Sequence, residues 1–151
     1  MTPVFHLKLA FEDDLVRIQT DDLNDFISVE WLRHPSGKEF REMSVTIGSD
    51  HLLSGYRYHL SDVRAINYLE IAEQNWLLKN RKMFYRESQF RKIASITSRL
   101  TLELMDMLRL RDDLQGQIEP VGKTKVEIFT SKAEALEWLF SDTRKAFYLS
   151  L

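Results

Sequence analysis

The sequence predicts one α/β domain over residues 1–151, built on a mixed β-sheet that packs against about four helices. Two observations predict it. The first third alternates apolar and polar residues with the period of half-buried strands, and from residue 36 short apolar runs alternate with segments of helical period. Strands joined by short turns pair antiparallel, and strands separated by helices pair parallel. We therefore expect an antiparallel meander followed by βα units.

The meander is defined by two acidic turns, at residues 12–14 and 21–25. Turns of this composition end strands because Asp and Asn hydrogen-bond their own backbone. The alternating segments on either side predict strands over residues 5–11, 16–19 and 27–31.

The βα units are marked by helix-start signals. Ser36 with Glu39, and Ser131 with Glu134, have the spacing at which each side chain can bond the other residue's backbone N–H. We expect the following elements: a helix from residue 36, a strand over 56–60, a loop over 61–67, a helix over 68–76, a strand over 92–96, a helix from Ser98, a strand over 126–128 and a helix from Ser131. The helix after Ser98 is expected to bury one stripe, formed by Leu100, Leu104, Met107 and Leu108. The three tryptophans, Trp31, Trp76 and Trp138, are expected in the core.

Several classes of function lack their sequence signals. The chain has no cysteine, which excludes disulfides and thiolate nucleophiles. Its four histidines lack metal-ligand spacing, so we expect no metal and no cofactor, and the absence of hydrolase motifs favours a protein that is not an enzyme. The start of the chain does not resemble a signal peptide and no long apolar run occurs, so we expect a cytoplasmic protein without membrane contact.

Residues 79–92 hold six basic residues against one acidic residue, with three aromatic residues between them. Such a segment can bind nucleic acid, and with a net charge of −2 any such contact would have to come from this local patch, but we favour a solvated helix end with the aromatic residues turned inward and expect no nucleic-acid partner. The apolar tail, residues 146–151, could pair across a homodimer or fold over its own core. Both alternatives stay open.

The last strand and helix, Val126–Leu139, read VEIFTSKAEALEWL, and this segment resembles the end of STAS-like (SpoIIAA-like) proteins, in particular small bacterial ones of the Bacteroidetes type. The segment Tyr58–Arg64 corresponds to the central strand and switch loop of that family. The resemblance implies a SpoIIAA-like fold and a regulatory or signalling role through protein–protein contact. It departs from the family at Ala65–Leu69, where the phosphorylatable serine of the switch helix is missing, so switching by phosphorylation there is not expected.

The expected contact surface lies where parallel strands lead into helices, because that edge binds ligands in open α/β sheets. The partner- or ligand-binding residues we predict are Ser61, Asp62, Arg64, Asn67 and Tyr68. Other polar residues expected at this edge are His34, Ser36, Thr97, Ser98, Thr130 and Ser131. The hydroxyls of the serines and threonines among them could also simply cap helices. Arg64 could complete an anion site there, so the alternative function is a module that binds a nucleotide, an anion or a lipid-like ligand. The sequence does not name the partner.

Overall fold

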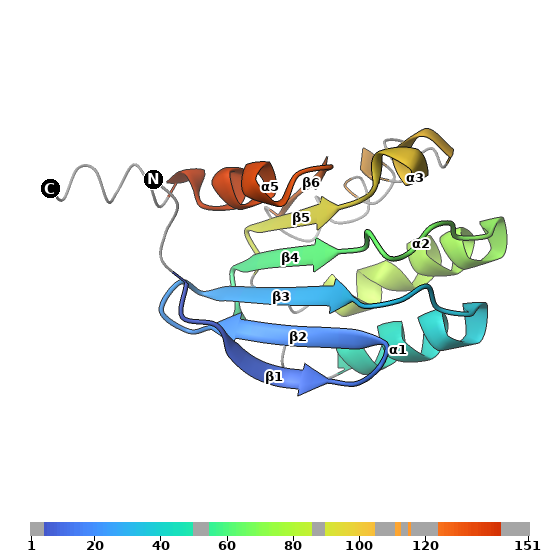
Figure 1. The fold of residues 1–151 in the computed structure, drawn as a ribbon, viewed down its shortest axis with the longest axis horizontal. Coiled ribbons are helices and arrows are strands. Elements are labelled where there is room, and N and C mark those ends of the chain that lie inside the picture. Colours follow the sequence, from blue (N-terminus) through green and yellow to red (C-terminus); the bar gives the residue numbers. More distant parts are fainter. Residues whose placement is uncertain are drawn as a thin grey trace, which may run out of the picture.

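The computed structural model describes residues 5–49, 55–85, 90–104, 111–112, 115 and 124–142. Six strands form one sheet in sequential order, β1 to β6 (Figure 1). The strands are β1 (Lys8–Glu12), β2 (Val16–Asp21), β3 (Phe26–Trp31), β4 (Tyr58–Asp62), β5 (Lys92–Ile96) and β6 (Lys125–Phe129). The helices in this part of the chain are α1 (Gly37–Ser49), α2 (Ile71–Tyr85), α3 (Arg99–Leu104) and α5 (Lys132–Leu139).

The predicted mixed sheet is confirmed. β1, β2 and β3 pair antiparallel, and β3, β4, β5 and β6 pair parallel. Because the parallel strands follow one another in one direction, right-handed crossovers bring their connecting helices to the same face of the sheet. α1 and α2 lie behind the sheet in Figure 1, whereas α5 lies in front of it.

Each face of the sheet has its own apolar core. Behind the sheet, Ile47 of α1 and Leu78 of α2 pack against buried residues that include Ile27 and Ile93. On the other face, α5 and the residue that follows it contribute Ala135, Leu139 and Phe140, which pack with Phe26, Leu60 and Ile96. A third cluster joins α1, α2 and the end of β3, where Trp31 packs against Phe40. Trp31 is buried, and Trp76 and Trp138 are partly buried against these clusters, as expected for core residues.

Three predicted boundaries are wrong. The first strand begins at Lys8, and its ladder shifts between Leu9 and Phe11. The strand expected over 56–60 is β4, which includes Ser61 and Asp62 because both continue the ladders to β3 and β5. The second helix begins at Ile71, three residues after the expected start, and the Gln74 N–H bonds the Glu70 carbonyl at 3.0 Å at its beginning.

Two sequence features fall largely or wholly outside the described part of the chain. These are the side chains of residues 81–89 in the basic segment and the tail at residues 146–151. No helix in the described ranges combines the length and the apolar character needed to cross a membrane.

Lys92 fixes α5 on the sheet. It is buried at the start of β5, and its Nζ donates to the carbonyl oxygen of Trp138 at 2.8 Å and to Ser141 Oγ at 2.7 Å. The same nitrogen lies 3.6 Å from Asp142 Oδ2 and 4.9 Å from the centre of the Trp138 ring. The ammonium thus meets the end of α5, where unpaired carbonyls carry partial negative charge.

Replacing Lys92 by Met should lower the free energy of unfolding by about 1–2 kcal/mol, because the last carbonyls of α5 lose a charged donor. Urea denaturation measures the change. Lys125→Met is the matched control, since Lys125 is the neighbour of Lys92 on β6 but is exposed. Equal stability of the two variants would contradict this role for Lys92.

Asp21 organises the turn between β2 and β3. Its buried carboxylate accepts hydrogen bonds from the backbone N–H groups of His6 (2.8 Å), Leu23 (3.1 Å) and Asn24 (3.2 Å), and from Asn24 Nδ2 (2.8 Å). Burial by itself would raise the pKa of Asp21, but these hydrogen bonds together outweigh it and lower the pKa. The carboxylate therefore ties the segment before β1 to the turn in its charged form.

Asp21→Asn should lower the free energy of unfolding by about 1–3 kcal/mol at pH 7. One carboxylate oxygen is replaced by an NH₂ group, which cannot accept the hydrogen bonds that the surrounding N–H groups donate. A lowered folded-state pKa contributes stability above the ordinary carboxyl pKa, and this is lost as pH falls through the folded-state value. The difference from wild type should therefore shrink below about pH 4. Urea titrations at several pH values test this, and Asp22→Asn, which keeps an acceptor for the Tyr56 hydroxyl, is the control. A pH-independent difference would count against the charged form as its source.

Candidate functional site

The predicted contact surface lies at one edge of the sheet. The carboxyl ends of β3, β4 and β5 meet there, together with the first turns of α1, α2 and α3 (Figure 1). Loops at such an edge come from different parts of the chain, so their side chains can form one surface. Among the described residues, no three His, Cys, Asp or Glu side chains group as a metal site requires.

Asp62 and Arg64 form an ion pair with each other. The buried Asp62 carboxylate accepts from the Arg64 guanidinium at 3.0 Å (Nε to Oδ1) and 2.7 Å (Nη2 to Oδ2), and from the Arg64 backbone N–H at 3.2 Å. The hydrogen bond with Asp62 raises the pKa of Arg64, and the nearby charge of Glu30 adds to the effect. Arg64 was predicted as an anion ligand, but a buried carboxylate already neutralises its charge. Ser61 is also buried in β4. Because successive strand residues point to opposite faces, its side chain lies on the other face of the sheet from Asp62.

Asn67, in the loop after β4, bonds both the loop after β3 and the first turn of α3. Its backbone N–H donates to His34 Nδ1 at 3.2 Å, in the loop after β3. Its carbonyl oxygen accepts from Thr101 Oγ1 at 3.0 Å, in the first turn of α3. Thr101 in turn receives a hydrogen bond from Ser98 Oγ at 2.8 Å. The structure therefore brings together His34, Asn67 and Ser98, which the sequence placed at this edge from three separate segments.

Three large apolar side chains are exposed in these segments: Tyr68 (46%) on the loop after β4, Ile71 (69%) at the first residue of α2 and Leu100 (63%) in the first turn of α3. We call them the edge patch. Leu69 and Leu102, close to them in sequence, are partly buried and pack against the same apolar cluster. The residues of the edge patch therefore remain in contact with solvent, while Leu69 and Leu102 are partly buried.

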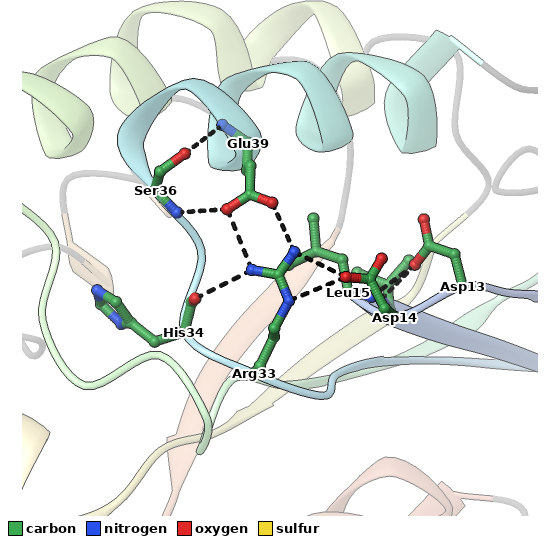
Figure 2. Close-up of polar contacts among 8 residues, drawn as sticks. Asp13, Asp14, Leu15, Arg33, His34, Ser36 and Glu39 are labelled. Carbon is green, nitrogen blue, oxygen red and sulfur yellow. Dashed lines mark hydrogen bonds and ion pairs between the residues drawn. The ribbon is translucent and has the colours of Figure 1, made fainter.

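Arg33 connects this edge to the turn between β1 and β2. Its guanidinium donates to Glu39 Oε1 at 3.1 Å and Oε2 at 2.6 Å, and to Asp14 Oδ2 at 3.0 Å, as Figure 2 shows. Hydrogen bonds from Arg33, and then from the Ser36 backbone, lower the pKa of Glu39 to about 2. Glu39 is thus held as a carboxylate at the start of α1, where negative charge is favourable.

The serines at this edge cap helices, which is the simpler of the two roles the sequence allowed. Glu39 N–H donates to Ser36 Oγ at 3.1 Å while Ser36 N–H donates to Glu39 Oε1 at 2.9 Å, so the predicted capping box is confirmed. Ser98 Oγ accepts from Thr101 N–H at 3.1 Å, and Ser131 Oγ accepts from Glu134 N–H at 3.3 Å. Thr97 is buried at the end of β5 and Thr130 is exposed.

Sequence analysis missed Arg33, Thr101, Ile71 and Leu100. Leu100 was expected on the buried stripe of its helix, and this is wrong, because the hydrogen bonds of Thr101 to the loop after β4 turn Thr101 and Leu102 inward and Leu100 outward. The S-x-x-T spacing of Ser98 and Thr101 was a usable local signal for the start of α3. The partner of the Thr101 hydroxyl, 34 residues away, had none.

No protein-family model matches this chain, and no curated protein matches it. A search of solved structures finds the crystal structure of an uncharacterised protein from the DUF3478 family with a SpoIIAA-like fold, from Shewanella loihica PV-4. It is 12% identical, covers 92% of this chain and 98% of that chain, and has a TM-score of 0.49. The description of that protein names the fold that the sequence resemblance implies.

Thr101→Val should loosen the joined loops, because the isosteric side chain cannot donate to the Asn67 carbonyl. We expect the free energy of unfolding to fall by about 1–2 kcal/mol and the amides of residues 66–70 to exchange faster. Hydrogen exchange read by mass spectrometry or NMR measures the second effect. Thr130→Val, at an exposed position after β6, should change neither quantity. If loop exchange stays at the wild-type rate, Thr101 does not hold the loops.

Proposed function

We propose that this chain is a non-enzymatic regulatory domain that binds another protein through the carboxyl edge of its sheet. The observation that carries the proposal is the edge patch, in which Tyr68 on the loop after β4, Ile71 at the start of α2 and Leu100 at the start of α3 are all exposed, next to hydrogen bonds that join that loop to α3. Contiguous exposed apolar side chains at a functional edge are typical of contact surfaces, and rigid aromatic residues often supply most of the binding energy.

The way the edge patch is supported favours tight contact. Asn67 is bonded on both its N–H and its carbonyl side, and Leu69 and Leu102 are anchored by packing against one apolar cluster. A surface whose loops are already ordered loses less conformational entropy when a partner binds. The edge patch is thus built as a preformed surface.

The polar groups around the patch support contact over chemistry. Asp62 is paired with Arg64, and Ser36 and Ser98 accept backbone hydrogen bonds at helix starts. A nucleophile or a general acid or base needs an activating neighbour, and Asp62, Ser36 and Ser98 are instead bonded to a guanidinium and to backbone N–H groups. The stretch Ala65–Leu69, which corresponds to the switch segment of STAS-like proteins, contains no serine, so we propose a contact that does not depend on phosphorylation there.

Photo-crosslinking in the source cells tests the proposal. A photoreactive amino acid at position 71 should yield a discrete adduct with a partner protein, and the adduct should weaken when Tyr68→Ala and Leu100→Ser are added. With the purified partner, the double variant should bind roughly tenfold or more weakly, as expected for loss of hot-spot side chains. Thermal stability should stay near the wild-type value because both residues are exposed.

Val45 supplies the control. It is an exposed apolar residue on α1, outside the edge patch, so the photoreactive group at position 45 should not give the same adduct and Val45→Ser should bind as wild type does. Equal adducts at both positions, or none at position 71, would contradict the proposal. A small molecule retained in native mass spectrometry would instead favour the ligand-binding alternative.

A further inference from the structure

β1 forms one rim of the sheet. It pairs with β2 on one side, and no strand in the described part of the chain pairs with its other side (Figure 1). All its residues are exposed, and Leu9 (55%) and the preceding Leu7 (44%) are among the most exposed leucines. An open strand edge with exposed apolar side chains is a template for pairing with another strand.

The order of charges along this segment determines which strand fits. The basic residue Lys8 comes first, and the acidic residues Glu12 and Asp13 come last. A second β1 running antiparallel would set the basic half of each copy against the acidic half of the other. A parallel second copy would set like charges side by side, which destabilises a strand pair. The segment is therefore self-complementary in the antiparallel direction.

Lys8 is available for such a pair. It forms no ion pair with a described residue, whereas Glu12 is bonded to Arg17 across the β1–β2 ladder. The carboxylate of Glu12 can accept from a second cation, since it has acceptor sites beyond the one that Arg17 uses. Each two-fold pairing would contain two such basic–acidic contacts.

We propose that two copies of this chain associate through antiparallel pairing of their β1 strands, extending the two six-stranded sheets into one continuous sheet. The pairing of β1 with β2 is irregular between Leu9 and Phe11. Only short stretches of β1 on either side of this irregularity can therefore pair with a second copy. The dimer is therefore weak and reversible. This association is separate from the edge patch, which lies at the carboxyl ends of the central strands.

Sedimentation velocity of the purified chain over a wide concentration range tests the proposal. We expect a monomer–dimer equilibrium that weakens as salt is added, because exposed charge pairs are screened. Lys8→Glu should weaken dimerisation roughly tenfold, since it places like charges together twice in each interface. The variant should fold normally because Lys8 is exposed, and its thermal melting checks this.

Lys38→Glu is the matched control. Lys38 is an exposed lysine on α1, so the variant has the same net charge as Lys8→Glu but leaves β1 intact, and it should dimerise as wild type does. Ile71→Ser should also leave the dimer unchanged, which separates this proposal from the function proposed for the edge patch. A chain that stays monomeric at all concentrations would overturn the proposal, as would a dimer that Lys8→Glu does not weaken.

Discussion

The sequential order of the six strands is the constraint from which the rest of the structure follows. The connections between the parallel strands are right-handed, so α1 and α2 pack on the same face of the sheet. Among the described helices, α5 covers the opposite face. One short helix covers only part of a six-stranded sheet. Its position therefore has to be fixed by specific contacts, and the Lys92 ammonium at its end provides them. Over β2 and β3 the same face carries charged side chains, and Arg17 there bonds Glu12 and Glu30 from the two neighbouring strands.

The same constraint explains the chemistry of the carboxyl edge. Parallel strands deliver three loops and three helix starts to one place, and each helix start presents backbone N–H groups that need acceptors. The polar side chains there satisfy those groups or one another, as in the Ser36–Glu39 box and the Asp62–Arg64 pair. What remains for a partner is the apolar edge patch. A surface whose polar groups are internally paired costs less to desolvate than one with free polar groups, which supports the protein contact proposed for this edge.

Local signals in the sequence predicted the strands and the helix starts. Period-two alternation gave the meander, and the capping box at Ser36 gave the start of α1 to within one residue. The errors come from contacts between segments far apart in sequence. Pairing with β3 and β5 extends β4 to Asp62, and no local pattern reports that Thr101 bonds the Asn67 carbonyl, a contact that turns Leu100 outward. Five site residues were named, and the structure gives them different positions: Ser61 and Asp62 are buried in β4, whereas Arg64, Asn67 and Tyr68 are exposed on the loop that follows it.

The two proposed surfaces are independent for a geometric reason. β1 runs in the same direction as β3 to β6, so an antiparallel β1 pair would point the carboxyl edges of the two copies in opposite directions. Each edge patch would then stay open and could bind its own partner, and no single small partner could bridge both. Binding at one edge patch makes no contact with β1, so the effects of changes at Lys8 and at Ile71 should add. A dimer of this kind would bind two partner molecules at once. Its binding would be strengthened by avidity only if the two partner molecules are themselves linked.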